Sequence, residues 1–158
     1  MRPSINCSLI RFSNTYNNLT VSETAIDYYK KNNSPLEVIE LASLGNNKFG
    51  NTVEKIIIEL FEGKKSLDTH YDFTYKGIKI EVKSSRYWVG VYDFRWQHIE
   101  QSYNYDLLLF ASLEFSGINL YVITKKEFFN SKCIQQDKQG FWAWKNNIKT
   151  KIRRITSI

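Results

Sequence analysis

Two short alternating segments restrict the fold more than any other feature of the sequence. Apolar and polar residues alternate over residues 71–76 and again over residues 78–83, and Gly77 lies between the two runs. Side chains with a period of two point to opposite faces of a β-strand, so both segments are predicted to be strands. Lys76 and Gly77 would form the two-residue loop of an antiparallel hairpin.

This hairpin would place two carboxylates opposite each other. In its register Asp72 faces Glu81, with Cβ atoms about 5 Å apart, and Lys83 lies on the same side of the sheet. Like charges placed opposite each other destabilise a sheet, so the pair requires a compensating cation. Lys83 would compensate in part, and a divalent metal would compensate more completely.

Mg²⁺ is the metal that suits these ligands, with Mn²⁺ as its substitute. Mg²⁺ takes one or two carboxylates, keeps several waters and completes its shell with substrate phosphate. We expect Asp72, Glu81 and the backbone carbonyl of Val82 to hold the metal, which would activate a water for phosphodiester hydrolysis. Lys83 would orient that water or help to deprotonate it.

The rest of the chain predicts a single mixed α/β or α+β domain over residues 1–158, in which helices pack against a small sheet. Residues 1–20 are polar and are a candidate extended arm. The other elements follow from hydrophobic periodicity and capping residues. They are helices at residues 25–31, 35–45, 51–62, 97–105 and 124–129, and strands at residues 107–113 and 119–123.

The hairpin residues resemble a known superfamily of nucleases. Tyr71-Asp72, followed after eight residues by Glu81-Val82-Lys83, resembles the PD-(D/E)XK signature, with Tyr71 in place of the proline. The resemblance covers roughly residues 48–124 and implies a restriction-endonuclease-like αβββαβ core. Around this core we expect an N-terminal helical region and a basic C-terminal extension.

Glu54 has two interpretations at this point. By resemblance it occupies the position of an acidic site residue on the helix that precedes the hairpin. From the residues alone, Asn51 and Glu54 have the spacing of a capping box, in which the glutamate satisfies a free backbone N–H at the start of a helix. The sequence favours neither of these two roles.

The resemblance implies an Mg²⁺-dependent DNA endonuclease, similar to small type II restriction enzymes that act as homodimers on double-stranded DNA. Two alternatives stay open. One is a structure-selective nuclease of the same superfamily, such as a Holliday junction resolvase. The other is a non-catalytic nucleic-acid-binding module whose hairpin is an ordinary amphipathic surface.

Charged and aromatic residues indicate where DNA would be held. The net charge is +6, and the last 21 residues contain six basic residues and no acidic one, so the excess lies at the C-terminus. Residues 86–96 combine arginines with aromatic residues, which either stack on bases or, as Trp88 and Trp96, anchor the core. Residues 141–158 would form a hairpin with its basic residues on one side. The predicted DNA contacts are Ser84, Ser85, Arg86, Arg95, Gln97, His98, Gln101, Lys149, Lys151, Arg153 and Arg154.

The sequence argues against several classes of protein. Cys7 and Cys133 are far apart and suggest neither a disulfide framework nor a thiolate zinc site. The apolar runs are too short for a membrane span and no signal-peptide pattern is present, so we expect a cytoplasmic protein. Residues 45–52 superficially resemble a phosphate-binding loop, but Asn51 replaces its lysine, so no nucleoside triphosphate is expected.

Overall fold

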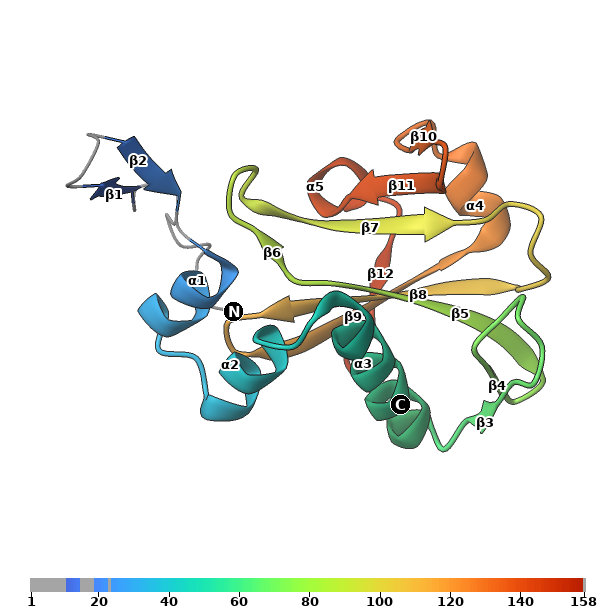
Figure 1. Ribbon diagram of the computed structural model, residues 1–158. Coiled ribbons are helices and arrows are strands. Elements are labelled where there is room, and N and C mark those ends of the chain that lie inside the picture. Colours follow the sequence, from blue (N-terminus) through green and yellow to red (C-terminus); the bar gives the residue numbers. More distant parts are fainter. Residues whose placement is uncertain (1–10, 15–18, 23, 158) are drawn as a thin grey trace.

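The computed structural model of the chain describes residues 11–14, 19–22 and 24–157, with a six-stranded mixed sheet at its centre (Figure 1). β5 and β8 run parallel, and the other neighbouring strands are antiparallel. The predicted mixed α/β class is therefore confirmed. In spatial order the strands are β12 (Arg153–Arg154), β9 (Gly117–Thr124), β8 (Leu107–Glu114), β5 (Ile78–Ser85), β4 (Phe73–Tyr75) and β3 (Lys64–Lys65).

A second, four-stranded sheet lies above the first in Figure 1, on the face opposite to α2 and α3. Its strands, in spatial order, are β10 (Gln135–Asp137), β11 (Gly140–Trp144), β7 (Asp93–Ile99) and β6 (Tyr87–Trp88). In a separate antiparallel pair, β1 (Arg11–Asn14) falls within the predicted N-terminal arm and β2 (Leu19–Ser22) begins at its end. Residues 1–10 and 15–18 of that arm lie outside the described residues.

Five helices belong to the described part of the chain, and two of them begin with a capping box. Thr24 and Asp27 cap α1, and Thr124 and Glu127 cap α4, each through reciprocal hydrogen bonds between side chain and backbone. The helices are α1 (Ala25–Lys31), α2 (Leu36–Ala42), α3 (Asn46–Phe61), α4 (Lys125–Asn130) and α5 (Lys145–Ile148).

α3 begins five residues before the predicted start, with Gly45 as its N-cap residue. Glu62 ends the helix in the left-handed conformation, with φ of 51°. Asn51 and Glu54 therefore lie inside the helix, where backbone N–H groups already have partners one turn earlier. The capping-box interpretation of Glu54 is wrong.

The predicted hairpin is present in the predicted register. Phe73 pairs with Ile80, and the pairing continues to a loop of Lys76 and Gly77. These two residues have φ of 48° and 79°, and successive positive φ values are typical of the type I′ turn that matches the twist of the strands. Because β4 begins at Phe73, Asp72 lies one residue before the ladder.

β8 separates two apolar clusters. On one face Leu109 belongs to a cluster with Val53 of α3, and on the other face Leu108 belongs to a cluster with Trp96 of β7. A strand that is covered on both faces is apolar throughout, which explains the unbroken run over residues 107–111.

Residues 97–105 are not helical, so the second helix of the expected αβββαβ core is absent from the described residues between β5 and β8. β7 advances three residues from Trp96 to Ile99 while the paired β11 advances two. This is a β-bulge, and His98 lies within it with φ of 59°. Because of the bulge, the buried residues Trp96 and Ile99 are three positions apart. In the sequence this spacing is the same as that of one helical turn.

The C-terminal segment also differs from the prediction. β11 pairs with β7 and β10, while β12 pairs with β9 at the far edge of the large sheet. Lys149 ends α5 and Lys151 lies in a turn, so these lysines do not share one side of a strand with Arg153. The reason lies in the apolar residues: buried Ile148 and partly buried Ile152 pack into one cluster at the four-residue spacing of a helical turn.

None of the helices in the described part of the chain combines the length and the apolar composition that crossing a membrane requires.

Candidate active site

A cleft of about 890 Å³ opens along the second half of β5. β4 pairs only with the first three residues of β5, so the edge that follows has no partner strand among the described residues. α3 lies on one side of this cleft, and β6 and β7 lie on the other. Its lining brings together four of the five predicted catalytic and metal-binding residues: Glu54, Asp72, Val82 and Lys83.

Asp72 occupies the place where β4 would have continued. Its carboxylate Oδ2 accepts a hydrogen bond from the backbone N–H of Val82, with 2.7 Å between the heavy atoms. The N–H and C=O of one strand residue point to the same side in an antiparallel ladder, so the Val82 carbonyl is directed to the edge that carries Asp72. The carboxylate and this carbonyl are therefore neighbours at the cleft.

Glu81 and Lys83 form an ion pair, with 2.6 Å between Lys83 Nζ and Glu81 Oε1. Both side chains are on the same side of β5, as the alternation predicts. Glu81 is only 5% exposed and is not among the residues that line the cleft, whereas Lys83 reaches it. The ammonium group thus lies between a buried carboxylate and the open cleft.

Both carboxyls of the hairpin are harder to ionise than usual. The pKa of Glu81 is raised to about 7, chiefly by burial; Lys83 opposes this rise, and the charges of Asp72 and Glu54 contribute to it. Burial also raises the pKa of Asp72, with a further contribution from Glu54, although the Val82 N–H and the Lys83 charge favour its ionised form. The negative charge at this edge is incompletely compensated by the protein.

Glu54 lies on α3 and is held by Lys65 of β3, with 2.5 Å between Lys65 Nζ and Glu54 Oε1. Hydrogen bonding to Glu54 raises the pKa of Lys65, which stays charged. Sequence reasoning missed Lys65, because Lys64-Lys65 has no periodic pattern and lies between two predicted elements. Its exposed ammonium adds a second positive charge near the Asp72 edge.

A divalent metal fits this edge by the chemistry of its donors. Among the described residues Oδ1 of Asp72 accepts no hydrogen bond, and the Val82 carbonyl offers a second hard oxygen. No three His, Cys, Asp or Glu residues converge into a metal site within the described ranges. Such a metal would therefore take at most two carboxylates and obtain its other ligands from water and phosphate, as Mg²⁺ does. It would also compete with Lys83 for Glu81.

Six of the predicted DNA contacts line the cleft, and five of them are at least partly exposed: Ser84, Arg86, Arg95, Gln97 and His98. Ser85 also borders it but is buried, and its hydroxyl accepts from Arg95 N–H and donates to the Arg86 carbonyl. That hydroxyl joins β5 to β7 and is already fully used. Ser85 is therefore a structural residue.

Arg86 is a structural residue as well. Its guanidinium donates to the carbonyls of Ala42 and Leu44 at the end of α2, and to the side chain of Asn46 at the start of α3. A free helix C-terminus leaves carbonyls without intrahelical partners, and Arg86 satisfies them. No local pattern in the sequence indicates this role, because the partners lie 40 to 44 positions away.

The remaining predicted contacts lie elsewhere. Gln101 lines a separate pocket with Tyr105 and Lys125. Arg153 forms an ion pair with Glu127 at 3.3 Å, and Arg154 donates to the side chain of Asn119. The strand that carries these arginines is three strands from β5, about 14 Å away. Lys149 and Lys151 are exposed near this far edge, outside the lining of the cleft.

Comparison with known proteins identifies no relative: no protein-family model matches the chain, and no curated protein matches it.

Proposed function

We propose that this chain is a divalent-metal-dependent DNA endonuclease of the PD-(D/E)XK type. One observation carries the proposal: Asp72, Val82 and Lys83 meet at the unpaired edge of β5, with Glu81 directly behind Lys83. The raised pKa values of the two carboxyls support a site that gains a cation when it is in use.

In this proposal each residue has a separate task. Asp72 and the carbonyl of Val82 hold the metal at the cleft, and Glu81 holds the Lys83 ammonium and supplies a second carboxylate. Bound Mg²⁺, or Mn²⁺ in its place, supplies charge stabilisation at the attacked phosphate and acidifies a water. Lys83 donates to a phosphate oxygen or to the attacking water from its position at the lining.

A binding module without catalysis is a weaker explanation of the same cleft. Glu54 and Asp72 line the cleft and Glu81 lies directly behind it, so carboxylates lie close to the place of a phosphate backbone, and without a metal their negative charge weakens DNA binding. A surface that only binds DNA is instead rich in lysine and arginine, which contact the phosphates. The carboxylates are useful at this position when a divalent cation joins them to the phosphate.

Cleavage of double-stranded DNA needs one site for each strand, so a homodimer is part of the proposal. A single cleft per chain would cut one strand, and two copies related by a twofold axis would cut both. Sedimentation of the protein with and without DNA tests this part separately from the chemistry.

The experiment is incubation of the purified protein with supercoiled plasmid and with a synthetic four-way junction, each with Mg²⁺, with Mn²⁺ or with EDTA. Discrete plasmid fragments that appear only with metal support a sequence-specific enzyme. Cleavage of the junction alone supports a structure-selective nuclease, such as a junction resolvase. Binding of both substrates without cleavage under any metal condition contradicts the proposal.

A further inference from the structure

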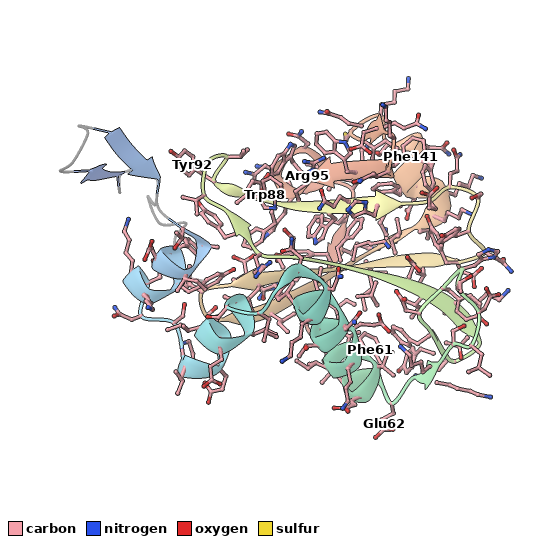
Figure 2. All side chains as sticks on the ribbon, in the orientation of Figure 1. Phe61, Glu62, Trp88, Tyr92, Arg95 and Phe141 are labelled. Carbon is pink, nitrogen blue, oxygen red and sulfur yellow. The ribbon has the colours of Figure 1, made fainter. Side chains whose placement is uncertain are left out.

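Three tryptophans and one arginine gather beside the cleft, on the sheet formed by β6, β7 and β11. Arg95 lies on the central strand, with Trp144 opposite it on β11 and with β6, which carries Trp88, on its other side. Trp142 comes from the same strand as Trp144. Figure 2 shows Trp88 and Arg95 adjacent along the upper rim of the molecule. We call these four residues the tryptophan platform.

The guanidinium of Arg95 is held by the rings. Its central carbon lies 3.9 Å from the ring centroid of Trp142, 5.4 Å from that of Trp88 and 5.8 Å from that of Trp144. Its ion pair with Asp137 is long, at 3.6 Å, and its Nε is buried without a hydrogen-bond partner among the described residues. Stacking on aromatic faces thus fixes this cation in place.

This arrangement excludes one class of ligand and favours another. Aromatic cages commonly bind cationic ligands, but here the protein's own Arg95 occupies that position and repels a second cation. A neutral planar ring, with a phosphate nearby, has the complementary chemistry. A nucleobase attached to its backbone supplies both.

Trp88 is the most exposed member of the platform. Trp88 is 40% exposed, whereas Trp96 on the neighbouring strand is fully buried in the core. Trp88 is held edge-to-face by Trp144, at 5.5 Å between centroids, and this contact orients its ring before any ligand arrives. An oriented and exposed indole stacks on a base with little loss of conformational entropy.

Trp88 and Arg95 line the same cleft as Asp72 and Lys83. Trp88 lies five positions after Lys83, so their Cα atoms are at most about 17 Å apart. Stacked DNA advances about 3.4 Å per nucleotide of one strand, so this distance corresponds to about five nucleotides. A strand that crosses the candidate active site therefore reaches the platform.

We propose that the tryptophan platform stacks on an unpaired nucleobase of the DNA substrate, within about five nucleotides of the scissile phosphate. A base inside a fully paired duplex offers no free face, so this role makes the protein selective for DNA with a bulged, gapped or single-stranded position. The proposal rests on the proposed function for the identity of the substrate, while stacking itself requires no cleavage.

The test measures binding in EDTA, where no cleavage takes place. Fluorescence anisotropy compares a short fully paired duplex with the same duplex carrying one unpaired nucleotide. Wild-type protein binds the second DNA about tenfold more tightly, and Trp88→Ala abolishes that preference. Trp88→Phe keeps most of it, because a phenyl ring also stacks. Leu36→Ala, which removes an exposed apolar side chain on α2, leaves it unchanged.

A second readout is independent of the stability of the variants. Aminopurine at the unpaired position loses fluorescence when an indole stacks on it, so wild type quenches it and Trp88→Ala does not. Equal affinity of wild type for both DNAs overturns the proposal, and so does an unchanged preference in Trp88→Ala. If the protein prefers the DNA with an unpaired nucleotide but cuts no DNA, only the proposed nuclease activity is refuted. If it cuts DNA without this preference, only the proposed role of the platform is refuted.

Discussion

The carboxylate of Asp72 accepts a hydrogen bond from the backbone N–H of Val82, with 2.7 Å between nitrogen and oxygen. This bond fixes the carboxylate to the strand that carries Glu81 and Lys83, although Asp72 itself lies outside the β4–β5 ladder. Asp72 replaces a backbone acceptor that a longer β4 would have supplied. The site is thus formed where the strand pairing stops.

Asp72→Asn separates charge from geometry at this position. The amide oxygen of asparagine accepts the same hydrogen bond, so the variant folds with a midpoint of thermal unfolding equal to or above that of wild type. The negative charge is lost, and cleavage with Mg²⁺ falls at least about a hundredfold. Unfolding curves and single-turnover rates measure the two effects. Full cleavage by a folded Asp72→Asn protein would remove Asp72 from the mechanism.

Glu81 makes stability depend on pH. Its pKa rises from an ordinary value of 4.5 to about 7 in the folded protein, so the folded state retains a proton that the unfolded state loses between these values. Without metal, the free energy of unfolding therefore falls as the pH rises from about 4.5 to about 7, by about 3 kcal/mol.

Glu81→Gln removes this part of the pH dependence, because glutamine does not titrate. Mg²⁺ restores stability to wild type at pH values above 7, where the ionised carboxylates are available to it. Chemical denaturation at a series of pH values, with and without Mg²⁺, measures both effects. Identical pH profiles for wild type and Glu81→Gln would show that this carboxyl is not buried as described.

Glu54 acts on Asp72 through its charge. Glu54→Gln removes a negative charge that raises the pKa of Asp72 and Glu81, so the acid limb of the rate profile moves to lower pH. Glu59→Gln is the matched control, because Glu59 lies on the same helix but is exposed and pairs with Lys55. A pH profile that shifts equally in both variants would contradict a specific role for Glu54.

Arg86→Ala tests the structural assignment of that arginine. The substitution leaves the carbonyls of Ala42 and Leu44 without their donor, and we expect the free energy of unfolding to fall by about 2 kcal/mol. The salt dependence of DNA binding by the folded fraction stays that of wild type. A lower salt slope with unchanged stability would instead return Arg86 to the DNA-contacting residues.

The exposed lysines at the C-terminus give a separate test. Deletion of this segment would remove β12 and the partly buried Ile152, so charge removal is the cleaner experiment. If DNA extends over the far edge of the sheet, Lys149→Gln with Lys151→Gln reduces the slope of log affinity against log salt by about 2. Lys55→Gln, exposed on α3, is the control. An unchanged slope in the double variant would exclude these lysines as phosphate contacts.

The hairpin was predictable from the sequence because its information is local. Alternation over residues 71–83 and the Lys76-Gly77 loop determine the strands, the turn and the register together. The site residues near this hairpin follow from the same local pattern. Val82 was proposed only through its carbonyl, and its N–H proved to be the group that holds Asp72.

The parts that could not be predicted depend on distant partners. The bulge at His98 is visible only when β11 is placed beside β7, and without it Trp96 and Ile99 have helical spacing. In the sequence Arg86 has the features of an unpaired cation, and only the folded structure brings the end of α2 beside it. The tryptophan platform brings together Trp88 and Trp144, which are more than fifty positions apart, so no local sequence pattern predicts it.

The most direct measurement is the rate of DNA cleavage by Lys83→Ala, compared with wild type at saturating Mg²⁺ and with the metal omitted. Lys83 touches both Glu81 and the cleft, and its removal leaves the hairpin and its register in place. The account predicts Mg²⁺-dependent cleavage by wild type and at least about a hundredfold lower rate for the folded variant. Equal rates for the two proteins, or cleavage that persists in EDTA, would contradict it.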